Sequence, residues 1–229
     1  MRVAALYDVH GNLPALEAVL AEAGRERVDL VVAGGDVVWG PRPSECLRLL
    51  REARAAFVRG NCEREVAERC DEAAAWCADR LDDEERVFVA SLPLAERREG
   101  VLFCHATPRS DSEVVTVLSP DERVRAAFGG VGERLVVCGH THRQYDRRVD
   151  GVRVVNAGSV GLPYEGRSGA FWALVAGDVD LRCTAYDVER AAADAEASGF
   201  PAADVFSAAL RGPRPADDVA AEFEARAGA

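Results

Sequence analysis

The first part of the chain alternates short apolar runs with longer amphipathic segments. Each run is rich in β-branched and aliphatic residues and stops at a glycine or a polar residue, and the segment that follows repeats its apolar positions at helical spacing. Such an alternation predicts a parallel sheet flanked by helices, with functional loops at the carboxyl ends of the strands. The predicted strands are residues 3–6, 30–33, 56–58, 101–104 and 135–138.

Helices are predicted between these strands. Asn12 is expected to cap the first of them, which carries Pro14 in its first turn. Ser44 is expected to open the second. The later predicted helices cover residues 43–52, 63–79 and 82–91.

The pattern changes after residue 142. Asp150-Gly151 and Gly177-Asp178 separate β-rich segments and are typical hairpin turns, so antiparallel strands are predicted at 145–149, 152–155, 170–175 and 179–186. The alanine-rich segment from about residue 187 is predicted to be helical, with a packing role. No linker divides the chain, which predicts one domain over residues 1–229 with this helical appendage at its end.

Charge and cysteine content narrow the class of protein. The net charge of −11 disfavours nonspecific binding to nucleic acid or to an anionic membrane, and predicts no particular oligomeric state. The seven cysteines form no C-x-x-C pair, which favours reduced thiols. The apolar run at residues 1–8 is too short for a signal peptide or a membrane span. We therefore expect a cytoplasmic protein.

Candidate metal ligands follow the predicted strands. All four histidines stand in strand-end segments beside aspartate, asparagine or glycine. Residues two apart on an extended segment point to the same side, so each Asp-x-His or His-x-His pair can face one ion. Imidazoles and carboxylates in this number exceed the needs of one tetrahedral ion and suit two neighbouring ions bridged by a carboxylate. The segments are Asp8-Val9-His10, Gly35-Asp36, Gly60-Asn61, His105 and Gly139-His140-Thr141-His142.

In this order the segments resemble the signature D-x-H, G-D, G-N-H-[ED], H, G-H-x-H of the calcineurin-like metallophosphoesterase superfamily, in particular a bacterial and archaeal phosphodiesterase-like subgroup related to diadenosine tetraphosphatases and serine/threonine phosphatases. The resemblance implies an α/β fold, a four-layer αββα sandwich of two mixed sheets flanked by helices. It also implies two divalent or trivalent ions, Mn, Fe, Zn or Ni, with Mn favoured in vitro. One ion would be held by Asp8, His10, Asp36 and His142, and the other by Asp36, Asn61, His105 and His140.

One position departs from that signature. Much of the superfamily has histidine after the Gly-Asn, where this chain has Cys62. That histidine is credited with protonating the leaving group, and a thiol with an ordinary pKa of about 8.5 is a weaker acid at this position. Cys62 is thus either a catalytic acid or an inert buried thiol. The resemblance assigns the other catalytic roles to Asp36, Asn61, His105 and His140.

The expected reaction is hydrolysis of a small phosphoester, a phosphodiester or a nucleotide-type ester. Two ions about 3.5–4 Å apart activate a bridging hydroxide for attack on phosphorus. The alternatives are a serine/threonine phosphoprotein phosphatase, whose leaving group is poorer, and a non-catalytic metal-binding interaction scaffold.

Three residues are candidate substrate contacts, each with a competing role. Asn12 either caps its helix only or also lies near the phosphate. Arg64 and Arg109 follow motif segments and either hold the phosphate bidentately or are ordinary exposed arginines. The loop at 158–164 either resembles a loop of the same subgroup in function or serves as a turn between the sheets.

Overall fold

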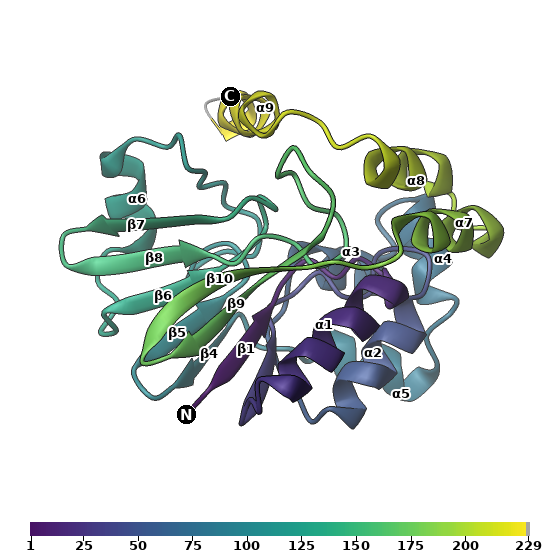
Figure 1. Cartoon of the computed structure of the whole chain (residues 1–229), viewed down its shortest axis with the longest axis horizontal. Helices are drawn as coiled ribbons and strands as arrows, with labels where there is room; N and C mark the ends of the chain where they lie inside the picture. Colours follow the sequence, from purple (N-terminus) through teal and green to yellow (C-terminus); the bar gives the residue numbers. More distant parts are fainter. Residues whose placement is uncertain (228–229) are drawn as a thin grey trace.

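The apolar runs of the sequence form two mixed sheets of five strands each within residues 1–227, the part of the chain that the computed structural model describes (Figure 1). The first sheet has the order β10 (Asp178–Thr184), β9 (Ala170–Ala176), β1 (Val3–Leu6), β2 (Leu30–Ala33) and β3 (Ala56–Phe57). Its strands β1, β2 and β3 are parallel, and β9 and β10 extend the sheet in antiparallel pairing.

The second sheet is built in the same manner. Its order is β4 (Ala95–Arg98), β5 (Val101–Cys104), β6 (Leu135–Cys138), β8 (Val152–Asn156) and β7 (Tyr145–Val149). Strands β5, β6 and β8 are parallel, whereas the edge strands β4 and β7 are antiparallel to their neighbours.

Both faces of strand β1 are buried. Val3, Ala5 and Tyr7 pack in the layer between the two sheets, while Ala4 and Leu6 face the helices. A strand buried on both faces has a continuous apolar sequence, which explains why the sequence pattern predicts this strand well. The outer face of the first sheet is covered by α1 (Leu13–Arg25), α2 (Pro43–Glu52), α3 (Asn61–Glu68), α4 (Glu72–Ala78) and α5 (Asp83–Ala90), and that of the second by α6 (Asp121–Phe128). The predicted four-layer αββα sandwich is confirmed.

Helix starts test the local predictions. Asn12 caps α1 as expected, because its Oδ1 accepts the Ala15 N–H at 3.2 Å. Ser44 does not cap α2. This helix begins at Pro43, and the Ser44 hydroxyl donates to the Glu85 carboxylate at 2.9 Å.

The long helix predicted over 63–79 is wrong, since the structure has two helices there. Arg69 adopts a left-handed φ of 57° and ends α3, and Asp71 then caps α4 by accepting the Ala74 N–H at 2.7 Å. A side-chain oxygen that satisfies a backbone N–H starts a new helix at little cost, which favours the break. Strand β4 and helix α6 were not predicted. No helix within residues 1–227 combines the length and the apolar character needed to cross a bilayer.

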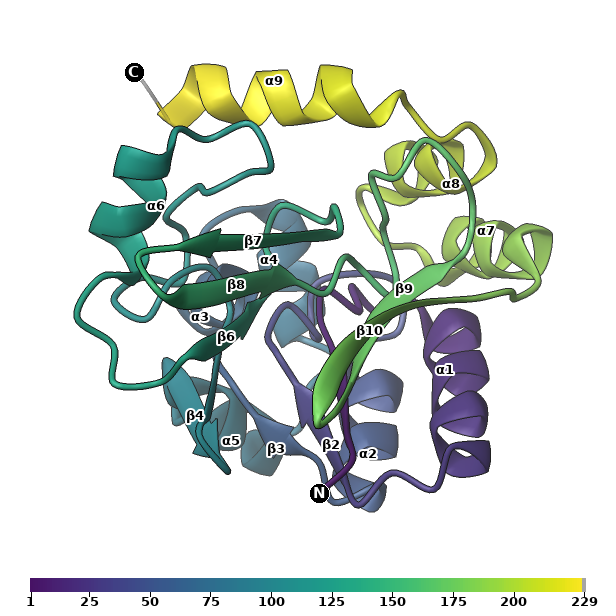
Figure 2. The ribbon, with the colours of Figure 1, turned by 60° about the vertical axis from the view of Figure 1, so that its left-hand side comes forward.

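Three helices end the chain, as expected from about residue 187. They are α7 (Val188–Ser198), opened by Asp187, α8 (Ala203–Arg211) and α9 (Ala216–Ala227). Helices α7 and α8 pack on each other through small and aromatic side chains. Helix α9 stands apart and crosses the molecule from α8 towards α6 (Figure 2).

Candidate metal centre

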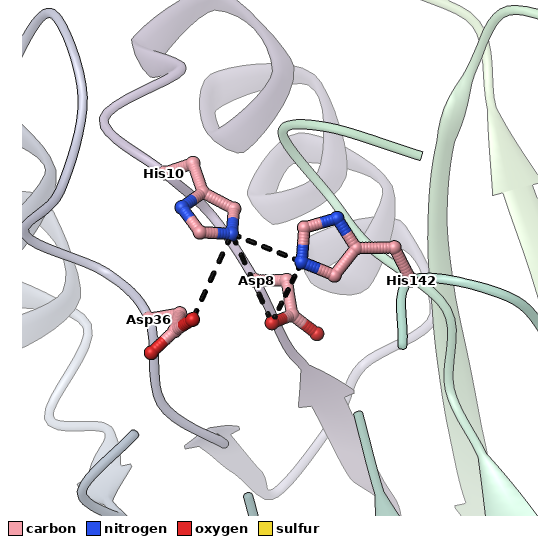
Figure 3. A group of neighbouring side chains, drawn as sticks. All are labelled: Asp8, His10, Asp36 and His142. Atoms are coloured by element: carbon pink, nitrogen blue, oxygen red, sulfur yellow. Dashed lines mark hydrogen bonds and ion pairs between the residues drawn. The ribbon is translucent and has the colours of Figure 1, made fainter. Parts of the chain in front are cut away.

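The predicted ligands meet where β1, β2, β5 and β6 end. Their donor atoms fall into two groups, within each of which all atoms lie within 4.8 Å of one another. Asp36 belongs to both groups, so its carboxylate stands between them. The first group, drawn in Figure 3, is Asp8, His10, Asp36 and His142, and the second is Asp36, His105 and His140.

The backbone of this centre is strained. Asp8 and His10 have φ values of 53° and 47°, Asp36 has 54°, and His140 and His142 have 67° and 56°. The expected extended geometry of the two pairs is therefore wrong. A left-handed residue other than glycine costs of the order of 1–3 kcal/mol, and such strain persists only where the surroundings enforce it.

Neighbouring backbone enforces this conformation. The N–H of Asp8 donates to the carbonyl of Gly35 at 3.1 Å, and that of His10 to the carbonyl of Asp36 at 2.8 Å. Gly60 allows the close approach, since a Cβ there would lie 2.1 Å from the Asp36 Oδ1. Backbone hydrogen bonds thus join the loop of Asp8 and His10 to the loop of Gly35 and Asp36, and glycine at position 60 leaves room for the Asp36 carboxylate.

The side chains of the first group lie close together in Figure 3. The Asp8 Oδ1 is 3.2 Å from the His142 Nε2 and 3.9 Å from the His10 Nε2, and the two imidazole nitrogens are 3.1 Å apart. In the second group the Asp36 Oδ2 is 3.4 Å from the His105 Nε2. Nitrogen and oxygen donors therefore converge on two shared spaces.

Two histidines are oriented by backbone carbonyls. The Nδ1 of His105 donates to the Gly34 carbonyl at 2.9 Å, and that of His142 to the Leu162 carbonyl at 2.6 Å. Burial acts to lower the pKa of His105, but Asp36 and Asp8 outweigh it and raise that pKa to about 10, so in the metal-free protein its Nε2 is protonated as well. An ion that binds there displaces this proton, and Nε2 then faces the carboxylates with its lone pair while the Nδ1–H stays on the carbonyl. This is the usual arrangement of an imidazole that binds a metal.

Several buried donor atoms of the centre have no hydrogen-bond partner within the described residues. They are the Asp8 Oδ1, the His105 Nε2, the Asn61 Oδ1 and the His10 Nδ1. A buried polar atom without a partner costs free energy, and cations bound among the side chains would satisfy the first three; the fourth is the ring nitrogen of His10 that does not face the carboxylates. The donor set therefore fits metal binding.

In the metal-free protein, the protonation states of the candidate ligands follow from burial and from the charges of the other ligands. Burial acts to raise the pKa of Asp36, but His105 and other imidazoles outweigh it and hold that pKa below its ordinary value. Burial lowers the pKa of His10 to about 4, assisted by His142, and burial with His105 lowers that of His140 to about 4. The carboxylate is thus ionised and these two imidazoles are neutral at pH 7, the protonation states that bind cations.

Glu63 is a structural member of the centre that the sequence analysis missed. Its side chain is 1% exposed, and its Oε2 accepts the N–H groups of Asp36 and Gly60 at 2.7 Å each. Its Oε1 accepts those of Val37 and Val38 at 2.7 and 3.3 Å. One carboxylate therefore holds the Gly-Asp and Gly-Asn loops together. The signal in the sequence is its place two residues after Asn61.

Cys62 contacts the shared carboxylate. Its thiol donates to the Asp36 Oδ2 at 3.1 Å, and its N–H donates to Oδ1 at 2.8 Å. Burial, followed by the charge of Asp36, raises the pKa of Cys62 well above its ordinary value. The thiol is therefore protonated and is a weak proton donor in the metal-free protein. Asn61 stands beside it at the start of α3.

The three candidate substrate contacts lie outside the two donor groups. The Asn12 amide donates to the carbonyl of Gly161 at 2.9 Å and so ties α1 to the loop at 158–164. Arg64 pairs with the buried Asp111 at 3.2 Å. The exposed Arg109 pairs with a carboxylate four residues further on, Glu113. Substrate binding by these side chains stays a prediction.

The family model of the calcineurin-like phosphoesterase superfamily domain matches residues 1–180. An uncharacterized protein of Methanocaldococcus jannaschii is 31% identical over 193 residues, which are 72% of this chain and 78% of that protein. A metallophosphoesterase from Sphaerobacter thermophilus aligns with a TM-score of 0.82 and 27% identity over 93% of this chain and 100% of its own.

A hypothetical protein of Pyrococcus horikoshii OT3 shares the fold, with a TM-score of 0.80 and 19% identity over 93% of this chain and 99% of its own. The family match covers every strand-end segment that carries a predicted metal ligand, whereas helices α7, α8 and α9 lie beyond it. The chain belongs to the calcineurin-like phosphoesterase superfamily.

Proposed function

We propose that this protein hydrolyses a phosphodiester or a nucleotide-type phosphoester at a centre of two metal ions. The observation that carries the proposal is the pair of donor groups that share Asp36. Membership of a phosphoesterase family supports the reaction class. A carboxylate common to two groups of donors is what two adjacent ions require of a bridging ligand.

The proposed ligands divide between the two ions as the sequence analysis expects. Nitrogen and oxygen donors suit Mn, Fe, Zn or Ni, and availability decides among them. Unpaired buried atoms in both groups support occupancy of each. The first ion would be held by Asp8, His10, Asp36 and His142, and the second by Asp36, Asn61, His105 and His140.

Two ions bound there would supply activation of a water for in-line attack and neutralisation of the phosphoryl oxygens. The chain's own residues position these components. Asp36 is held by Cys62 and by the Glu63-linked loops, so its carboxylate cannot rotate freely. His140 is half-buried, whereas His105, whose ring centroid lies 5.1 Å from that of His140, is buried.

Cys62 limits the kinds of leaving group that this centre can release. A buried thiol with a raised pKa protonates a departing alkoxide poorly. A nucleotide phosphate or a phenolate departs without much help, whereas the alkoxide of serine does not. This favours diester and nucleotide-type substrates over phosphoserine proteins.

Cysteine chemistry supports a cytoplasmic location as part of the proposal. All seven cysteines are free, and Cys70 and Cys183 are exposed. Exposed free thiols persist in a reducing compartment and oxidise outside it.

The direct test uses purified protein supplied with Mn²⁺ and bis(p-nitrophenyl) phosphate. We expect metal-dependent release of nitrophenolate, which Asp36→Asn abolishes and which the exposed control Asp204→Asn leaves intact. Full activity of Asp36→Asn would exclude the bridging role. A parent protein without turnover of this ester with Mn, Fe, Zn or Ni would instead be a metal-binding scaffold.

A further inference from the structure

Helix α9 crosses the molecule from α8 towards α6 (Figures 1 and 2) and contacts a residue of the candidate metal centre, although it lies outside the residues that the family model matches. Its buried side chains are Val219 and Ala220. The half-buried ring of Phe223 lies with its centroid 6.4 Å from that of the His140 ring. The helix thus brings an aromatic side chain to the ligands of the second proposed ion.

A second ring covers the ligands of the first ion. The ring of Tyr164 stacks on His142, with centroids 4.7 Å apart and planes inclined by 14°. Its backbone N–H donates to the His142 carbonyl at 3.0 Å, which fixes the loop beneath the helix. Tyr164 and Phe223 are 6.2 Å apart, centroid to centroid. The two rings together form an aromatic roof, which we define as these two residues.

The ligands beside the roof are buried. His10 is 4% exposed, Asp36 is 2% exposed and His142 is 6% exposed. An ester whose phosphate reached these donors would have its organic group against the roof. A planar aromatic group stacks on such rings, whereas an alkyl group gains less.

The attachment of α9 is mostly polar. Glu224 accepts hydrogen bonds from Thr116 at 2.7 Å, from Ser119, and from Arg123 at 2.6 Å. Near the other end of the helix, Asp217 pairs with Arg143 at 2.8 Å. A segment with few buried apolar side chains opens at a low free energy.

The segment before α9 is a short exposed connection. Residues 212–215 read Gly-Pro-Arg-Pro, and Gly212, Arg214 and Pro215 are exposed. Arg214 pairs with Glu222 of α9 at 3.0 Å, and the Arg226 guanidinium lies 6.0 Å from the centroid of the Phe223 ring. These polar contacts lie at the edge of the helix beside the roof.

We propose that Tyr164 and Phe223 are the specificity-determining residues of the phosphoesterase proposed above, and that they bind a planar aromatic group of a small ester. Helix α9 acts with them as a lid that opens to admit this ester and excludes phosphoproteins. The inference rests on the proposed function for its phosphate site. Its tests measure binding and accessibility, so that they can be separated from turnover.

The binding test compares phenylphosphonate with methylphosphonate, because both present the same anionic head and differ in one ring. Calorimetric titration of the Mn²⁺-loaded parent should show tighter binding of phenylphosphonate. Phe223→Ala and Tyr164→Leu should each reduce the affinity for phenylphosphonate by about tenfold and the affinity for methylphosphonate by less than about twofold. Val205→Ala, at a side chain 75% exposed on α8, is the control and should change neither.

Equal losses for both phosphonates, or no loss for either, would overturn the aromatic subsite. The proposed function is judged separately by turnover of bis(p-nitrophenyl) phosphate. A parent that hydrolyses this ester while its roof variants bind both phosphonates as the parent does would retain the function and lose the inference. Thermal unfolding of each variant shows whether it is folded before binding is compared.

The lid test uses the metal-free protein and reads the modification of His140 by diethyl pyrocarbonate with mass spectrometry. Glu224→Gln removes the charge that fastens the helix and should raise the modification rate several-fold. Asp218→Asn removes an exposed carboxylate of the same helix and should leave the rate unchanged. Equal rates in the two variants would show that α9 does not gate the centre.

Discussion

Replacing Glu63 by glutamine should destabilise the protein and weaken its metal binding at the same time. Each oxygen of this carboxylate accepts two backbone hydrogen bonds. Oε2 accepts the N–H groups of Asp36 and Gly60, and Oε1 accepts those of Val37 and Val38. Burial and then Asp36 raise the pKa of Glu63, while the backbone donors act to lower it. Because each oxygen already faces two donors, the ionised form fits this site.

A glutamine side chain satisfies only half of these donors. Its NH₂ group must face two backbone N–H groups, so two bonds to a charged acceptor are lost. Each is worth about 1.5–3 kcal/mol, which gives a loss of about 3–6 kcal/mol before relaxation and before the relief of the buried charge. A loss of this size is a large part of the stability of an ordinary domain, about 5–15 kcal/mol.

The assay is urea unfolding of the metal-free protein, followed by calorimetric titration with Mn²⁺. We expect a lower urea midpoint for Glu63→Gln and an affinity for Mn²⁺ reduced about 10–100-fold, the usual effect of losing a residue that orients ligands. Glu68→Gln, on the exposed side of the same helix, should stay within about 0.5 kcal/mol of the parent. Parent-like unfolding and affinity in Glu63→Gln would refute the role assigned to this carboxylate.

Three further predictions follow from the geometry of the centre. Chelation of the metal should lower the melting temperature and Mn²⁺ should restore it, because Asp8 Oδ1 and His105 Nε2 have no hydrogen-bond partner in residues 1–227; an unchanged calorimetric transition would argue against a site there. Gly60→Ala brings a Cβ to 2.1 Å from the Oδ1 of Asp36, which displaces the shared carboxylate, and should reduce kcat/KM by about 100-fold, whereas Gly24→Ala, with open space around its Cβ, should not. Cys62→His should raise hydrolysis of an alkyl ester relative to a nitrophenyl ester, and an unchanged ratio of the two rates would make the thiol structural.

Strand positions were predictable from local pattern because burial on both faces leaves a strong signal. The bounds of β1, β2, β5 and β6 agree with the predicted runs. Strand β4 carries the polar sequence Ala95–Arg98 at a sheet edge, where one neighbour suffices and no apolar run is needed. Its pairing with β5 is decided by the sheet and leaves no mark in the segment itself.

The identity of the candidate ligands was also predictable, since a set of motifs in a given order is local information. Their conformation was not. Asp8 and His10 are left-handed, whereas the Asp-x-His spacing at a strand end predicts an extended segment. Hydrogen bonds from the neighbouring loop impose this backbone, and such bonds join residues that are far apart in the chain.

By itself the sequence determined the buried strands, the first helix cap, the family and the candidate metal ligands. Only the tertiary structure decided that Asp36 stands between two donor groups, that Glu63 joins their loops, and that Tyr164 and Phe223 cover them. The physical reason is the range of the interactions. Periodicity and capping act over a few residues, whereas the roof brings together a loop and a terminal helix whose contact depends on how sheets and helices pack.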